Sequence, residues 1–79
     1  MAVSEELLQK YLDNVPGHHS EIKWKKEALR SLAAIAPTRA DFMKHATTFV
    51  KDENGDCGML FKCPDGSCVA NKDDCQTKG

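Results

Sequence analysis

The sequence is short of three features that would assign it to a familiar class of protein. No uncharged run is longer than residues 31–38, which is far too short to cross a bilayer as a helix. The first residues lack the basic segment, apolar stretch and cleavage site of a secretory signal. The formal net charge is −1, so no general excess of cations is available for nucleic-acid phosphates. We therefore expect neither a membrane span nor a general nucleic-acid binder.

Patterns of catalytic or metal-binding residues are equally scarce in the 79 residues. His18 and His19 lie between two expected helices without a third metal ligand at a useful spacing, and His45 is one turn from Asp41 on a helix surface. No nucleophile with a neighbouring base can be argued from so short a chain. We predict a non-enzymatic protein with no catalytic residues, no metal site and no cofactor.

Residues 52–56 imitate the start of an EF-hand calcium loop. The imitation fails because Cys57 and Cys63 stand where such a loop needs its central Gly and its final bidentate Glu. We interpret this segment as the end of a helix followed by an Asn-Gly turn.

Composition changes abruptly between residues 51 and 52. Residues 1–51 hold eight Lys or Arg against six Asp or Glu, a balance of +2. Residues 52–79 hold three Lys against six acids, a balance of −3, together with all four cysteines. We therefore divide the chain into a three-helix unit, residues 1–51, and a cysteine-rich hairpin module, residues 52–79.

Three amphipathic helices are expected in the first unit, because apolar residues recur there at three- and four-residue intervals. Ser4 can cap a first helix over residues 4–14, and Ser20 a second over residues 20–36. Thr38 begins a capping box for the third, which extends to about residue 50. The apolar positions are, in helix order, Val3, Leu7, Leu8, Tyr11, Leu12 and Val15; Ile22, Trp24, Ala28, Leu29, Leu32, Ala33, Ile35 and Ala36; and Phe42, Met43, Ala46, Phe49 and Val50.

The pattern predicts a small all-α fold, a three-helix bundle with a C-terminal disulfide-stapled β-hairpin. The hairpin is expected to pair residues 59–62 with residues 67–69 around the turn sequence Pro64-Asp65-Gly66. About a dozen large apolar side chains barely offset the chain entropy of such a bundle. Because the cysteines lie outside the expected bundle, we expect the helices to rest against another surface.

The cysteines have the spacing C-x5-C-x4-C-x6-C, at Cys57, Cys63, Cys68 and Cys75. A zinc site usually places paired ligands two to four residues apart, and only the middle gap has that spacing. An even number of cysteines in a Gly- and Asp-rich segment suits two disulfides. We favour disulfides, with three possible connectivities, and keep zinc as the alternative.

Residues 57–69 resemble the first half of a low-density-lipoprotein receptor class A repeat. That family has a Phe two residues before its second Cys, a Gly ahead of its third Cys and an aliphatic residue directly after it. Phe61, Gly66 and Val69 occupy these positions here. With the segment through Cys75, the match covers about a quarter of the chain.

This resemblance implies a disulfide pairing but not an activity. The family joins its first and third cysteines, which implies Cys57–Cys68 and leaves Cys63–Cys75. The family's last two cysteines and its acidic calcium cage are absent from this sequence. Calcium binding and receptor-type ligand capture are therefore not carried over.

The string Cys63-Pro-Asp-Gly-Ser-Cys68, followed by Cys75, also resembles short cysteine motifs in virion proteins of large DNA viruses of algae. A chain without a secretory signal is expected to meet a reducing cytosol, where disulfides are rare. Large DNA viruses that assemble in the cytoplasm commonly encode a thiol oxidase. The resemblance therefore implies a virion location, and secretion is the alternative.

The helical unit has more apolar surface than three helices can cover. The first apolar stripe, which includes Leu8 and Tyr11, is wider than one short helix needs, and Trp24, Ala28 and Ile35 make the second helix apolar on more than one side. A lone Trp is either part of a core or an anchor for a partner. We name Trp24, Tyr11 and Leu8 as the expected partner-binding residues and other protein chains as the partners.

These features predict a structural or interaction protein, a small component of a larger assembly such as a viral capsid, where it would be a minor capsid or cement protein. No specific nucleic acid and no small-molecule substrate are expected. Two alternatives stay open: a secreted disulfide-rich binding module and a zinc-stapled intracellular regulator. The sequence has no Asn-x-Ser/Thr site, which counts mildly against the secreted alternative.

Overall fold

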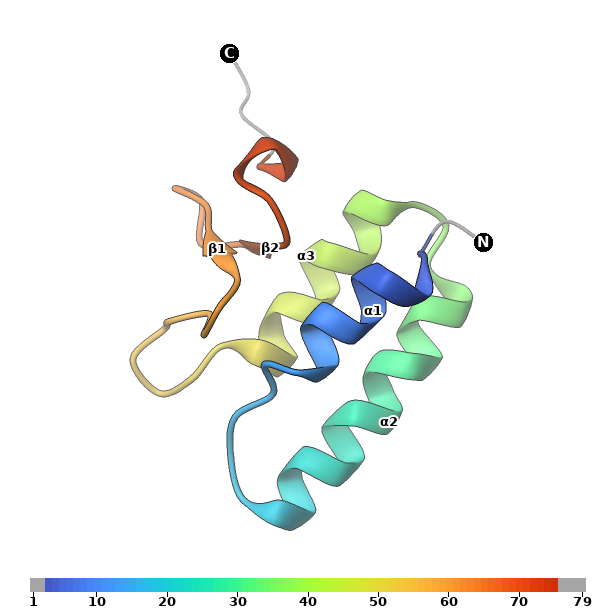
Figure 1. The fold of residues 1–79 in the computed structure, drawn as a ribbon, viewed down its shortest axis with the longest axis vertical. Helices are drawn as coiled ribbons and strands as arrows, with labels where there is room; N and C mark the ends of the chain where they lie inside the picture. The colour runs from blue at the N-terminus through green and yellow to red at the C-terminus, as the bar shows by residue number, and fades with distance from the viewer. Residues whose placement is uncertain (1–2, 76–79) are drawn as a thin grey trace.

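The computed structural model describes residues 3–75, which form three helices followed by a small two-stranded sheet (Figure 1). The elements are α1 Glu5–Leu12, α2 His19–Ile35, α3 Arg39–Val50, β1 Phe61–Lys62, β2 Cys68–Val69 and a final 3-10 helix, η1 Lys72–Asp74. The predicted fold class, three helices with a C-terminal hairpin stapled by two disulfides, is confirmed.

Side-chain caps fix where the first and third helices begin. The Ser4 hydroxyl oxygen accepts a hydrogen bond from the Leu7 amide at 3.1 Å. The Thr38 hydroxyl oxygen accepts one from the Asp41 amide at 3.0 Å. Each cap satisfies a backbone donor that has no partner inside its helix, and both caps agree with the sequence prediction.

Two helix ends differ from the sequence prediction. α1 is shorter than expected, and the Asn14 side chain donates a hydrogen bond to a carbonyl of its last turn at 2.7 Å. α2 begins with His18 as its N-cap, so the prediction that Ser20 caps this helix is wrong. The Glu21 carboxylate accepts a hydrogen bond from the His18 amide at 3.3 Å, so the first turn closes before Ser20 can serve as a cap.

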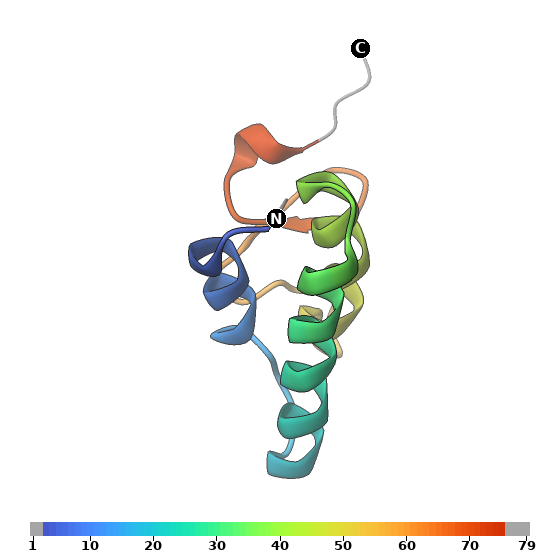
Figure 2. The ribbon, with the colours of Figure 1, turned by 90° about the vertical axis from the view of Figure 1, so that its right-hand side faces the viewer.

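Two of the helices form one layer, and the remaining helix packs across it. α2 and α3 lie antiparallel and side by side, and α1 packs across one face of this pair (Figures 1 and 2). β2 packs against α3, so the cysteine-rich segment lies on the far side of α3 from α2. α1 therefore covers one face of the α2–α3 pair and leaves the opposite face open.

The hairpin forms where it was predicted. β1 and β2 pair antiparallel, in the register Phe61 opposite Val69 and Lys62 opposite Cys68. The Asp65 carboxylate accepts a hydrogen bond from the Ser67 amide at 2.9 Å, which stabilises the turn and holds the pKa of Asp65 below its ordinary value. Gly66 has a φ of 96°, a conformation that favours glycine, so the turn depends on this residue.

One hydrophobic core joins the helices to the cysteine-rich segment. The Tyr11 ring meets the Phe42 ring edge-on with 5.1 Å between centroids, and the Tyr11 hydroxyl donates a hydrogen bond to the carbonyl of Cys68. Cys57, Cys63 and Cys68 belong to the same buried cluster as these aromatic side chains. The expectation that the cysteines lie outside the bundle is therefore wrong, because the hairpin packs on α3 instead of projecting away from it.

A second buried contact holds the same cysteine from the other helix. The Thr47 hydroxyl oxygen accepts a hydrogen bond from the Cys68 amide at 3.0 Å, and the hydroxyl donates one to the Met43 carbonyl at 2.8 Å. Tyr11 and Thr47 thus satisfy both backbone polar groups of Cys68. The boundary between residues 51 and 52 marks a change of composition, but the two segments share their core.

Candidate protein-binding surface

All four cysteines form disulfides, two in number. Cys57 pairs with Cys68 and Cys63 with Cys75, across Cα–Cα distances of 5.7 and 5.6 Å. This is the pairing that the receptor-repeat resemblance implies, although the resemblance itself stays a prediction. Because no thiolate is left to bind a metal, the zinc-stapled alternative is wrong.

The acidic segment after α3 is a turn, as its sequence indicated. The Asp52 carboxylate accepts hydrogen bonds from the amides of Asn54 and Asp56, both at 2.9 Å. One carboxylate oxygen, Oδ1, accepts both of these hydrogen bonds from the local backbone. Among residues 3–75, no three side chains of His, Cys, Asp or Glu are grouped to hold a metal ion.

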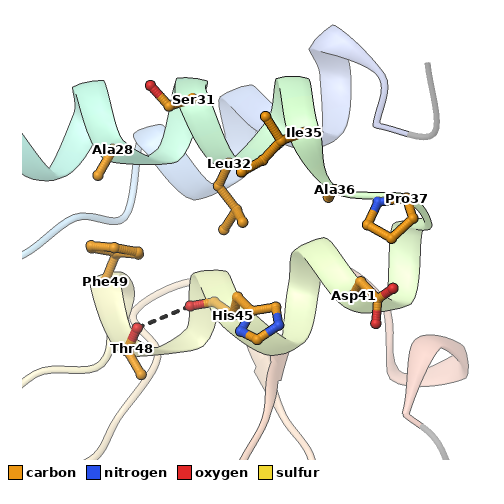
Figure 3. Close-up of a pocket in the computed structure, with 10 residues that line it drawn as sticks. All are labelled: Ala28, Ser31, Leu32, Ile35, Ala36, Pro37, Asp41, His45, Thr48 and Phe49. Carbon is orange, nitrogen blue, oxygen red and sulfur yellow. Dashed lines mark hydrogen bonds between the residues drawn. The ribbon is translucent and has the colours of Figure 1, made fainter.

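The open face of the α2–α3 pair carries an apolar groove, which we call the α2–α3 groove (Figure 3). Its volume is about 770 Å³. From α2, Ala28 and Leu32 point toward α3, and Phe49 of α3 reaches back toward them, while α1 lies behind α2 in this view. The lining residues are Ala28, Ser31, Leu32, Ile35, Ala36, Pro37, Asp41, His45, Thr48 and Phe49.

Two large apolar side chains extend this groove at its ends. The Trp24 side chain is 53% exposed and packs edge-on against Phe49, with 6.1 Å between ring centroids. Ile35 is 77% exposed at the other end of α2. Each side chain of this size gains about 1.5–3 kcal/mol when it is fully removed from water, so the face favours contact with a further apolar surface.

The three residues expected to bind a partner lie in two different environments. Trp24 is on the surface, where its partner role stays a prediction. Leu8 and Tyr11 are 7% and 0% exposed inside the chain's own core, so the expectation that they line a partner surface is wrong. Helical periodicity alone leaves their stripe partly uncovered, because it does not place the cysteine-rich segment in the same core.

Two apolar side chains expected in the core line the groove instead. Leu32 and Phe49 were expected in the core, but both are only half-buried and line the groove. Phe49 lies at the edge of the apolar stripe of α3, next to the polar Thr48 and one turn from His45, and this edge position was the available signal. The Thr48 hydroxyl donates a hydrogen bond to the His45 carbonyl at 2.9 Å (Figure 3).

Polar and apolar parts are arranged in the groove as in a protein–protein interface. Asp41 and His45 line it from α3, and Ser31 from α2, around the apolar side chains. Interfaces commonly combine such an apolar centre with a polar rim. The arrangement can therefore bind an apolar helix or loop of another chain.

Two further surface features lie away from the groove. The Arg39 guanidinium binds the Asp74 carboxylate of η1 through two hydrogen bonds of 2.9 and 3.3 Å and holds the pKa of Asp74 below its ordinary value. On the cysteine-rich segment, Met59 is 91% and Phe61 44% exposed. The first feature ties η1 to α3, and the second leaves two apolar side chains of the cysteine-rich segment open to solvent.

Comparison with known proteins gives no relatives for this chain: no family model matches it, and neither a curated protein nor a solved structure is similar to it. Among residues 3–75, no helix has both the length and the apolar character that a membrane span requires.

Proposed function

We propose that this chain is a non-enzymatic interaction protein that joins a larger assembly, such as a viral capsid, by docking its α2–α3 groove on another protein chain. The observation that carries the proposal is the exposure of Trp24 and Ile35 beside an open apolar groove. Tryptophan is among the residues that most often anchor protein interfaces, and Trp24 stands at one end of this groove with about half of its surface exposed.

The two disulfides indicate an oxidising environment for the folded chain. A virion whose assembly includes a thiol oxidase would provide it, and so would the extracellular space. We propose the virion location because the cysteine motif resembles those of virion proteins.

The test is incorporation of a variant into the particles of the native source. Trp24→Glu should leave the far-ultraviolet helical signal of the purified chain intact, because the side chain is half-exposed, and should abolish sedimentation with the particles. Met59→Glu is the matched control, since it introduces the same charge at an exposed apolar position of the cysteine-rich segment. A wild-type chain that sediments only as a free protein would contradict the proposal.

A secreted binding module is the second candidate, and the exposure of Met59 and Phe61 on the hairpin segment favours it. In that case the cysteine-rich segment is the recognition surface. Met59→Glu would then abolish binding of a partner and Trp24→Glu would not, which is the reverse of the result expected for the assembly protein.

A further inference from the structure

The two disulfides of this chain differ in their surroundings. We call Cys57–Cys68 the inner disulfide and Cys63–Cys75 the outer disulfide. Their cysteines are separated by 11 and 12 positions in the sequence, so loop closure hardly distinguishes the two. Both cysteines of the inner disulfide are buried, and two buried hydrogen bonds hold the backbone of Cys68. In the outer disulfide Cys75 is only half-buried, so water and solutes reach this pair more easily.

Surface hollows border the outer disulfide on two sides. The first has a volume of about 380 Å³ and is lined by Phe61, Pro64, Lys72, Asp73 and Cys75. The second, which we call the α3–hairpin hollow, has a volume of about 240 Å³, lies between α3 and the cysteine-rich segment and includes Cys63. Neither hollow includes a cysteine of the inner disulfide. Because a thiolate must reach a sulfur atom to reduce a disulfide, these hollows favour attack on the outer one.

The outer disulfide is also the main link between η1 and the rest of the fold. η1 lies at one end of the molecule (Figures 1 and 2). The amides of Asp74 and Cys75 donate hydrogen bonds within its own turn, at 2.9 and 3.1 Å. Within residues 3–75, the hydrogen bonds of η1 to another element are the two from Arg39 to Asp74, and an ion pair so open to water is weak. Without the disulfide, little else would keep η1 in place.

η1 forms one side of the α3–hairpin hollow. Asp74 lines this hollow together with Met43 of α3 and Val69 of β2. Met43 is 4% exposed and Val69 is 3% exposed while η1 is in place. Departure of η1 would therefore open the hollow on that side and expose apolar surface that the oxidised chain keeps from water.

We propose that the outer disulfide is a redox-sensitive latch, which a dithiol reductant opens to release η1 and to uncover Met43 and Val69 while the helices stay folded. This inference goes beyond the proposed function, because it concerns neither the α2–α3 groove nor its partner. A chain that passes from an oxidising to a reducing environment would open this latch first and keep its inner disulfide.

The opening step is an ordinary thiol–disulfide exchange. One thiolate of the reductant attacks Sγ of Cys75, and Sγ of Cys63 leaves as a thiolate that takes up a proton. The second thiolate of the reductant then attacks its own sulfur in the mixed disulfide, which closes the reductant's disulfide and releases the thiolate of Cys75 to be protonated. The chain gains two electrons and two protons, and the dithiol loses the same number.

Partial reduction of the purified, oxidised chain by dithiothreitol tests the order of opening. Free thiols are blocked with N-ethylmaleimide at intervals and located by mass spectrometry of the peptides. The outer disulfide should be reduced about tenfold faster or more, because a thiolate reaches the inner one only after wider unfolding. The chain labelled at Cys63 and Cys75 alone should keep its far-ultraviolet helical signal. Equal rates for the two disulfides, or labels that appear first on Cys57 and Cys68, would overturn the latch.

Amide hydrogen exchange of the chain with only its outer disulfide reduced tests the release of η1. The amides of Asp74 and Cys75 should exchange about tenfold faster or more than in the oxidised chain, whereas the Cys68 amide, bonded to Thr47, should keep its protection. The double variant Cys63→Ser, Cys75→Ser is a permanently open form and should behave alike. Unchanged exchange at η1 in both forms, or loss of protection at Cys68, would refute a latch that opens without unfolding.

A fluorescent apolar dye, 8-anilinonaphthalene-1-sulfonate, tests whether opening uncovers the hollow. Its fluorescence with the open double variant should be several-fold above that with the oxidised wild type, whose α2–α3 groove gives the background in both proteins. Circular dichroism of the same samples should show equal helix content. Equal fluorescence of the two proteins, or a rise that accompanies loss of helix, would mean that η1 does not gate this surface.

Discussion

The helical unit and the cysteine-rich segment reach the same core by different means. α2 and α3 are long enough to bury Leu29 and Phe42 completely through helical periodicity. The sheet has two strands of two residues each and depends on two disulfides for its shape. The difference shows that a segment too short to bury its own side chains can still complete a core when covalent links hold it in place.

The largest expected effect comes from the helical side of this comparison. Leu29→Ala should cost about 2–5 kcal/mol of unfolding free energy, because Leu29 is 0% exposed and its removal leaves a cavity. Leu32→Ala should cost much less, because Leu32 is only half-buried in the α2–α3 groove. Urea unfolding followed by circular dichroism measures both. Equal losses would mean that the groove is part of the core.

Loss of either disulfide should lower the free energy of unfolding by about 3 kcal/mol, which is the loop-closure contribution for loops of this length. Replacing Cys57 and Cys68 together by Ala should also lower the melting temperature of the helices, because this disulfide holds in place the Cys68 backbone, whose carbonyl and amide are hydrogen-bonded to Tyr11 and Thr47. Replacing Cys63 and Cys75 together should chiefly loosen the hairpin. Thermal unfolding at 222 nm distinguishes the pairs, and identical melting of both variants would show that the two disulfides act as one unit.

The hydrogen bond between Tyr11 and Cys68, which links the helical unit to the cysteine-rich segment, can be removed by deleting a single oxygen atom. Tyr11→Phe removes the hydroxyl that donates to the Cys68 carbonyl and should cost about 1–3 kcal/mol, because the carbonyl stays buried without its partner. Denaturant unfolding measures this loss. A variant as stable as the wild type would show that the carbonyl finds another donor.

The same tyrosine predicts a pH dependence. Burial raises the pKa of Tyr11 above its ordinary value of about 10, so the folded chain favours the neutral phenol. This contribution to stability is complete below pH of about 10 and is lost as the pH rises from there toward the raised pKa. Melting temperatures between neutral and strongly alkaline pH should fall more steeply for the wild type than for Tyr11→Phe. An equal fall of melting temperature with pH in the two proteins would contradict the role given to the neutral Tyr11 phenol.

The smallest effect is expected at the surface contact between α3 and η1. Arg39→Ala should cost less than about 1 kcal/mol, because the Arg39 side chain is 43% exposed and water competes for the ion pair. Arg39 lowers the pKa of Asp74, so its contribution is present above the unfolded value of about 3.9 and is lost as the pH falls through the lowered one. Arg30→Ala is the matched control. Unfolding at neutral pH and at pH of about 2 measures both, and a loss of several kcal/mol at Arg39 would show that η1 is essential to the fold.

The helices could be predicted well because the residues that determine them lie close together in the sequence. Periodic apolar residues, and the caps Ser4 and Thr38, act within one or two turns and require no knowledge of the rest of the chain. The failure at Ser20 is also local: several polar residues compete at the start of α2, and the Glu21–His18 contact decides between them. The hairpin was predictable because a strong turn sequence separates its strands.

The candidate site was predictable only in part, because burial depends on contacts between distant residues. The apolar excess of α2 at Trp24 and Ile35 follows from helix periodicity, and both are exposed. The burial of Tyr11 depends on Cys68, which is 57 residues away in the sequence and leaves no local trace. Leu8 and Tyr11 were therefore taken for surface residues, whereas both are buried and Tyr11 is hydrogen-bonded to the hairpin segment.

The contacts of Cys68 with Tyr11 and Thr47 bear on how the chain acquires its disulfides. Four cysteines can be joined in three ways, and a free hairpin would have little reason to prefer one. α1 and α3 are built from local contacts and can form before oxidation, since such contacts close quickly. Once they hold the backbone of Cys68, the fold brings Cys57 to a Cα–Cα distance of 5.7 Å from it, as the native disulfide requires. The helices then act as an internal template for oxidative folding, and the cysteine-rich segment without α1 and α3 would form mixed disulfide pairings.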